Sequence, residues 1–179
     1  MSEIDCSAAT GGFVTGGESV THAETVVQGV RISVYSPHIS DGIVEPIQKL
    51  LGETGFQSDL ADIILVMGDF NANLGTPQME LIQDQGFHSS WSDLKLNVRN
   101  TKTYDFIPGR GPNGETRNEG VIDNIMIKGK GVRAVDGGIV PAMTKKGKPM
   151  SDHTMIWAEL VIPRSQKCEK RRFPLPLRQ

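Results

Sequence analysis

The sequence predicts a mixed α/β domain built in layers, and two kinds of pattern carry that prediction. Apolar residues at helical spacing alternate with apolar runs of strand length early in the chain, and strand-like runs dominate its second half. The resulting order of strand, helix, strand, helix, strand, strand is typical of helices packed on a sheet. The runs of strand length are Val30–Tyr35, Ile63–Met67, Val121–Ile127 and Met155–Ile162.

The first two elements follow from residues 30–52. Residues 30–35 alternate apolar with polar or amphipathic side chains, as a half-buried strand does. Pro37 should end the pairing of this strand, because proline has no N–H to donate. Apolar residues then recur at helical spacing from Ile43 to Leu51, which predicts a helix that Gly52 closes.

The second helix has clear start and stop signals after the strand at 63–67. Thr76 is a suitable N-cap, Pro77 suits the first helical position, and Gly86 is placed to end the helix. The remaining chain is predicted to hold short extended segments at 87–94 and 103–107, a polar loop at 108–120, a strand at 121–127, a Gly- and Lys-rich loop to Met150, and a last strand at 155–162.

Size and charge restrict the classes of protein to consider. A chain of 179 residues suits one domain, and its net charge of −2 gives no overall basic field. Contact with nucleic acid would therefore depend on a local basic patch or a bound cation. No apolar run approaches a membrane span of about 20 residues, and no secretory signal begins the chain. We therefore expect cytoplasmic or nuclear localisation.

Three segments differ in pattern and give the expected domain organisation. Residues 1–29 are rich in Gly, Ser and Thr and predict at most a hairpin around Thr15–Gly17. Residues 30–163 carry the periodic elements and form the expected domain. Residues 164–179 hold several Lys, Arg and Pro residues and are expected to be a solvated basic tail.

Asp69 and Asn71 directly follow the apolar strand at 63–67. Ligands gather outside the carboxyl ends of strands in α/β proteins, where loops hold polar groups on a rigid scaffold. A carboxylate can position a water or a metal ion, and an amide can donate to a phosphate. The alternative interpretation is an Asp-x-Asn turn that only satisfies backbone groups.

A second polar group, Ser151-Asp152-His153, precedes the last strand. The proton equilibrium of histidine lies near neutral pH, so His153 can take a proton from water or give one to a leaving oxygen. Asp152 offers the oxygen ligand that Mg²⁺ or Mn²⁺ prefers. A capping Ser-Asp pair beside a surface histidine would give the same residues.

Asp123 and His38 complete the candidate set. Asp123 interrupts an apolar strand, where a carboxylate is disfavoured unless it is paired. An imidazole is a natural partner, because an Asp behind a His fixes its tautomer and stabilises the imidazolium. His38 follows the strand at 30–35 and could stabilise charge on a phosphoryl group. An exposed edge-strand Asp and a loop His are the alternatives.

Four motifs occur in series: Ile64–Ala72 with its Gly-Asp-Phe-Asn core, Thr103-Tyr104, Ile122–Ile125, and Ser151–His153. In this order they resemble the C-terminal half of the endonuclease/exonuclease/phosphatase superfamily, most closely its deoxyribonuclease-like and retroelement-type members. The resemblance runs from about residue 29 to about residue 162. It implies the C-terminal part of a four-layered α/β sandwich, with two mixed sheets flanked by helices and most of the N-terminal half missing.

The resemblance also implies roles for individual residues. Asp69 matches the carboxylate that activates the attacking water near the metal, and Asn71 matches the amide that binds the scissile phosphate. Asp123 matches the partner of the terminal histidine, which is His153. The remaining matches are His38, which corresponds to a catalytic and substrate-binding histidine, and Asp152, a metal-associated acid. The implied metal ligands are Asp69, Asn71, Asp152 and His153, and the implied cofactor is Mg²⁺ or Mn²⁺.

One family feature has no counterpart in this sequence. The superfamily carries an upstream Glu as its principal metal ligand, and neither Glu3, Glu18 nor Glu24 follows a matching strand. In addition, Asn124 stands where the family usually has an aromatic residue or His.

These observations leave several functions open. The first is metal-dependent phosphodiester hydrolysis by a nuclease, with nucleic acid as the expected partner. The second is an incomplete or noncatalytic domain, whose missing sheet a second copy or a complementing chain would cover. A third is a lipid or small-molecule phosphoesterase on the same scaffold.

Overall fold

The computed structural model describes residues 11–15, 18–39, 59–96, 103, 120–141 and 143–163. The predicted helix at 43–52, most of the 103–107 segment and the 108–120 loop, and the basic tail lie outside these residues. No helix among the described residues is long and apolar enough to cross a membrane. The described elements form two sheets with short helices, which confirms the mixed α/β architecture expected from the sequence.

Sheet A has six strands in the order β1-β2-β3-β4-β6-β5. Strand β3 pairs antiparallel with β2 and parallel with β4, and β4 pairs antiparallel with β6. This mixture of parallel and antiparallel pairs gives a mixed sheet. The strands are β1 (Gly11–Thr15), β2 (Glu18–Val27), β3 (Val30–His38), β4 (Ile63–Asp69), β5 (His88–Ser89) and β6 (Asp123–Gly129).

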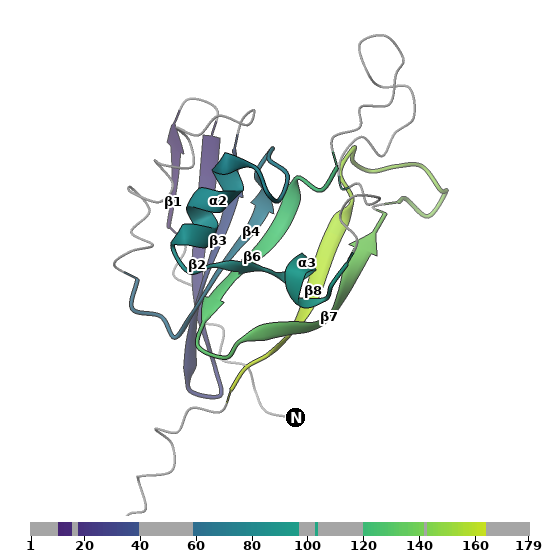
Figure 1. The fold of residues 1–179 in the computed structure, drawn as a ribbon. Coiled ribbons are helices and arrows are strands. Elements are labelled where there is room, and N and C mark those ends of the chain that lie inside the picture. The colour runs from purple at the N-terminus through teal and green to yellow at the C-terminus, as the bar shows by residue number, and fades with distance from the viewer. Residues whose placement is uncertain are drawn as a thin grey trace, which may run out of the picture.

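Each face of sheet A packs against a different layer (Figure 1). On one face, helix α2 (Pro77–Asp84) buries Met79 and Ile82 against strand residues that include Val66. On the other face, Ile63, Ile125 and Ile127 pack towards sheet B. Strand β4 is therefore buried on both sides, which explains its uninterrupted apolar sequence.

Sheet B consists of β7 (Arg133–Val140) and β8 (Met155–Val161), paired antiparallel. The sequence predicts β8 but wrongly assigns residues 133–140 to a loop. Gly137 and Gly138 favour a turn by composition, yet both lie within β7, and at Gly137 glycine is needed for close packing. A Cβ at Gly137 would lie 2.7 Å from Leu94 and from the carbonyl oxygen of Trp157.

Two further local predictions need correction. Residues 87–94 are not one extended segment, because β5 is followed at once by the short helix α3 (Ser90–Asp93), where the Ser89 hydroxyl accepts a hydrogen bond from Trp91 N–H. Pro37 does not end β3. Its register with β2 continues to His38, whereas pairing with β4 skips Ser36 and Pro37 and resumes at His38.

The N-terminal residues contribute more sheet than their composition indicates. Strands β1 and β2 pair in register from Thr15 opposite Glu18 to Gly11 opposite His22, so the hairpin expected around Thr15–Gly17 extends into two strands of sheet A. A turn at Gln28–Gly29 then leads into β3, with both residues in the left-handed region.

The close approach of β3 and β4 gives a test of the packing. A Cβ at Gly68 would overlap the carbonyl oxygen of Pro37, and backbone cannot move aside as a flexible side chain can. We expect Gly68→Ala to lower the free energy of unfolding by about 1–3 kcal/mol, in the range of overpacked sites. Urea denaturation measures this change.

Gly138→Ala is the matched control for that substitution. A Cβ there would meet the Trp157 indole at 3.5 Å, an ordinary contact, in the same kind of element. Equal stability of the Gly68→Ala variant and the wild-type protein would contradict the packing described here.

Candidate active site

The sheet register brings three of the predicted residues into one row. Asp69, the last residue of β4, lies opposite His38 of β3 on one side and opposite Asp123 of β6 on the other. Neighbouring strands lie roughly 4.8 Å apart, so polar groups from three strands meet at one edge of sheet A. His153, just before β8, reaches the same edge.

A tight turn after β4 orients the Asp69 carboxylate. Asn71 has a positive φ of 45°, and its backbone N–H donates to Asp69 Oδ1 at 2.8 Å. The Asn71 side-chain amide donates to the carbonyl oxygen of Ile39 at 2.7 Å and to Asp69 Oδ2 at 3.2 Å. The Asp-x-Asn turn anticipated as an alternative is therefore real, and it also positions a carboxylate at the site.

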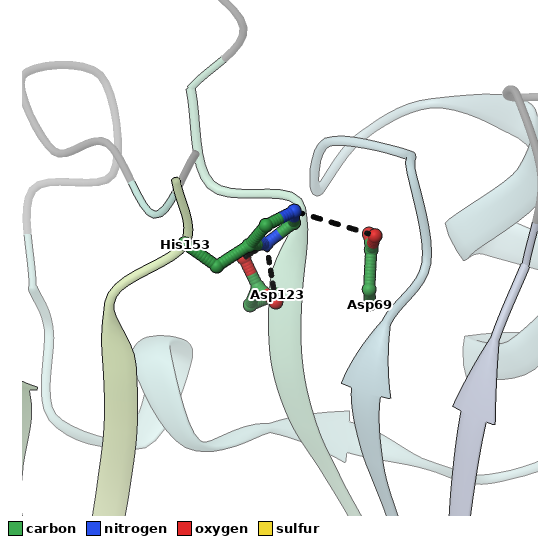
Figure 2. A group of neighbouring side chains, drawn as sticks. All are labelled: Asp69, Asp123 and His153. Atoms are coloured by element: carbon green, nitrogen blue, oxygen red, sulfur yellow. Dashed lines mark hydrogen bonds and ion pairs between the residues drawn. The ribbon is translucent and has the colours of Figure 1, made fainter. Parts of the chain in front are cut away.

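His153 lies between two carboxylates, as Figure 2 shows. Its Nδ1 is 3.0 Å from Asp123 Oδ2, and its Nε2 is 3.8 Å from Asp69 Oδ2. A carboxylate partner places a proton on Nδ1, so the neutral imidazole presents the lone pair of Nε2 to Asp69. Two acceptors at this separation are best satisfied by a water, a proton or a cation between them.

Burial raises the pKa of the Asp123 carboxyl group, and the negative charge of Asp69 adds to the increase. Hydrogen bonds from Thr103 and His153, with the positive charge available on His153, act in the opposite direction. The ionised form of Asp123 therefore depends on its neighbours. This dependence is the physical reason for a carboxylate in an otherwise apolar strand to be paired with an imidazole.

Thr103 connects the segments that carry Asp123 and His153, and the sequence gives it no role beyond its place in a motif. Its fully buried hydroxyl oxygen accepts hydrogen bonds from the N–H groups of Ile122 (3.1 Å) and Asp123 (3.0 Å). Its carbonyl oxygen accepts from Thr154 N–H at 2.8 Å. Runs of apolar residues give no signal for this role, because the partners of Thr103 are distant in sequence.

The donor set is compatible with a divalent cation. Ligand atoms of Asp69, Asp123 and His153 lie within 4.8 Å of one another. Carboxylate oxygens suit Mg²⁺ and Mn²⁺, which usually keep several waters as further ligands. The facing acceptors of His153 and Asp69 leave a place where positive charge is favourable.

The other predicted residues occupy different positions. His38 is largely exposed, and its Nε2 lies 3.7 Å from Asp69 Oδ2, so it belongs to the site. Asp152 is half-buried beside His153 but is not in the cluster of potential ligands found among the described residues. Glu24 of β2 lies opposite Ser33, and Ser19 of β2 lies opposite His38. Five positions separate Glu24 from Ser19, so Glu24 is roughly 17 Å from the site along the strand.

Glu3, Glu18 and Asn124 are the remaining residues singled out in the sequence. Glu3 lies outside the described residues, as does the side chain of Glu18. Asn124 is fully buried, and its amide donates to the carbonyl oxygen of Val121 at 3.4 Å.

Solved structures show which class of fold this is. A zebrafish TDP2 structure complexed with a single-strand DNA product aligns with a TM-score of 0.63 and 15% identity, covering 83% of this chain and 64% of that one. An endonuclease/exonuclease/phosphatase family protein from Leptotrichia buccalis aligns with a TM-score of 0.61 and 19% identity, covering 89% and 62%. The chain thus has the endonuclease/exonuclease/phosphatase fold, as the motifs indicate.

The same fold also serves a phosphatase. A mannosyl-6-phosphatase from Bacteroides thetaiotaomicron aligns with a TM-score of 0.53 and 19% identity, covering 81% of this chain and 57% of that one. The chain spans about three fifths of the length of these structures. No protein-family model matches the sequence, and no curated protein matches it significantly.

Replacement of Thr103 tests whether this residue holds the site together. Thr103→Val keeps the shape but leaves the N–H groups of Ile122 and Asp123 without their acceptor. We expect a loss of about 1–3 kcal/mol in the free energy of unfolding for each unsatisfied group. Urea denaturation measures the loss, and the NMR chemical shifts of the His153 ring measure the change at the site.

Thr103→Ser keeps the hydroxyl and is the matched control. It should retain the His153 ring chemical shifts of the wild-type protein, even if loss of the methyl group lowers stability slightly. A Thr103→Val protein with wild-type stability and unchanged His153 ring shifts would contradict the connecting role.

Proposed function

We propose that this protein hydrolyses phosphodiesters with the help of Mg²⁺ or Mn²⁺, and that it acts on nucleic acid as a nuclease. The observation that carries the proposal is the convergence of Asp69, Asp123 and His153 at the carboxyl end of β4 on this fold. The alignment with a TDP2 structure that holds a DNA product supports a nucleic-acid substrate.

Each residue of the site has its own proposed role in the hydrolysis. Asp123 holds the proton of His153 on Nδ1 and stabilises the imidazolium, so Nε2 can accept a proton from water or return one to a leaving oxygen. Asp69 orients the water and would hold the metal ion, which supplies charge stabilisation to the phosphoryl oxygens when bound. His38, largely exposed beside Asp69, is placed to donate to the phosphate.

Asn71 and Asp152 have less direct proposed roles. The Asn71 amide donates hydrogen bonds to Asp69 and to the carbonyl oxygen of Ile39, so it can donate to a phosphate only if it releases one of these acceptors. Asp152 adds negative charge next to His153 and could bind the metal through water.

Nicking of supercoiled plasmid by the purified chain tests the proposal. We expect cleavage only with Mg²⁺ or Mn²⁺, and a loss of about 10²–10⁴-fold in His153→Ala, the range for general acid–base groups. Asp69→Asn should also abolish cleavage. Asp84→Asn removes an exposed carboxylate at the end of α2 and is the matched control.

Two results would contradict the proposal. Cleavage that persists in His153→Ala and Asp69→Asn would assign the activity to other groups or to a contaminant. Absence of cleavage by a folded chain, combined with hydrolysis of a sugar or lipid phosphate that needs Asp69, would favour the phosphatase alternative that the mannosyl-6-phosphatase alignment represents.

We also propose that a second copy of the chain covers the outer face of sheet B, defined by Val140, Met155, Trp157 and Val161. These side chains share a face because Val140 pairs with Met155 and the β8 residues alternate. Each is more than 40% exposed, and Trp157 is 45% exposed. Glu159 shares this face between Trp157 and Val161. Exposed apolar side chains gathered on one face mark interaction sites, and an identical face on two copies suits a two-fold dimer.

Light scattering tests this association. We expect the wild-type chain to be dimeric at micromolar concentration and Trp157→Glu to be monomeric, because the substitution replaces the largest apolar side chain of this face with a second negative charge near Glu159. Glu159→Gln, on the same face of the same strand, should remain dimeric. A compact wild-type monomer would overturn the association but would leave the proposed hydrolysis intact.

A further inference from the structure

The connection between β7 and β8 forms an ordered projection beside the site. Thr144 N–H donates to the carbonyl oxygen of Lys148 at 2.8 Å, and Gly147 N–H donates to that of Thr144 at 2.9 Å. Lys148 N–H donates to the Thr144 hydroxyl at 3.0 Å. Met143 and Pro149 form a bridge at the base of this turn. The turn at 144–148 therefore has its own hydrogen bonds while all its side chains are exposed.

The turn concentrates positive charge in a protein of net charge −2. Lys145, Lys146 and Lys148 lie on it, and the segment from Pro141 to Ser151 contains no Asp or Glu. None of the three lysines forms an ion pair with a carboxylate in the part of the chain that the structure describes. Exposed cations without local partners are available to an external polyanion.

The positively charged turn lies shortly before the candidate active-site residue His153 in the chain. It leads directly into Ser151 and His153, and Figure 1 shows the connection at the same end of the sheets as the carboxyl end of β4. His153 is five positions after Lys148, so the two lie at most about 18 Å apart along the chain. Each strand of a nucleic acid carries a phosphate per roughly 3.4 Å of axis, so its backbone can reach both.

We propose that the turn at 144–148 is a second binding site for the nucleic-acid backbone, where Lys145, Lys146 and Lys148 contact phosphates several nucleotides from the one at His153. The inference rests on the proposed phosphodiester hydrolysis and gives that site a preference for polymers over small phosphoesters. The contacts are electrostatic, so they hold a strand in place without reading its sequence.

The salt dependence of oligonucleotide binding tests the proposal. The probe is fluorescein-labelled dT20, titrated with the full chain in EDTA from 50 to 300 mM KCl. Each phosphate contact on a single strand contributes about 0.7 to the slope of log K against log salt. We expect Lys145→Gln/Lys148→Gln to flatten that slope by up to about 1.4 and to weaken binding at low salt.

Lys130→Gln/Arg133→Gln is the matched control. It removes the same charge from exposed residues at the opposite end of β6, beyond Gly129. This variant should keep the wild-type slope. A wild-type chain that does not bind dT20, an unchanged slope in the turn variant, or an equal decrease in both variants would overturn the proposal.

A second assay separates this inference from the proposed function. Hydrolysis of bis(p-nitrophenyl) phosphate with Mn²⁺ needs no second phosphate contact, so the turn variant should match the wild-type rate. Binding that depends on the turn without hydrolysis of any diester would refute the proposed function alone. Hydrolysis with a slope that is independent of the turn would refute the second binding site alone.

Discussion

The register of β4 with its two neighbours is the constraint on which the rest of the site depends. Asp69 can meet His38 and Asp123 only because the parallel pair with β3 and the antiparallel pair with β6 both align at this one residue. A shift of one residue would turn Asp69 to the other face of sheet A. The shift would also remove Val66 from its fully buried place against α2 and turn it to the face that packs towards sheet B. Burial of the sheet therefore enforces the geometry of the polar edge.

His153 depends on a second constraint, because it does not belong to sheet A. It precedes β8, and the two sheets are joined near the site through the hydrogen bonds of Thr103. Thr103 holds the start of β6 with its hydroxyl and the start of β8 with its carbonyl. Strand register thus fixes the position of Asp123, and the hydrogen bond to buried Thr103 fixes the segment that carries His153.

Local patterns predict a large part of this arrangement from the sequence. The uninterrupted apolar run of β4 identifies a strand buried on both faces, and a carboxylate within the apolar run of β6 indicates the pairing of Asp123. Features that depend on distant contacts could not be predicted in this way. Gly137 and Gly138 imply a turn until Leu94 and Trp157 are known to pack on them. The role of Thr103 depends on partners 19 and 51 residues away.

The charges of the site residues depend strongly on one another. Asp69 and Asp123 place two carboxylates near one imidazole, and each negative charge makes the other costlier. A protonated His153 faces both of them, because its Nδ1 is directed to Asp123 and its Nε2 lies 3.8 Å from Asp69. The neutral imidazole compensates neither charge. Protonation of His153 or of His38, whose Nε2 lies 3.7 Å from Asp69, therefore stabilises the two carboxylates, and a cation between the ligand atoms would do the same. Titratable groups whose charges depend on one another in this way are typical of functional sites.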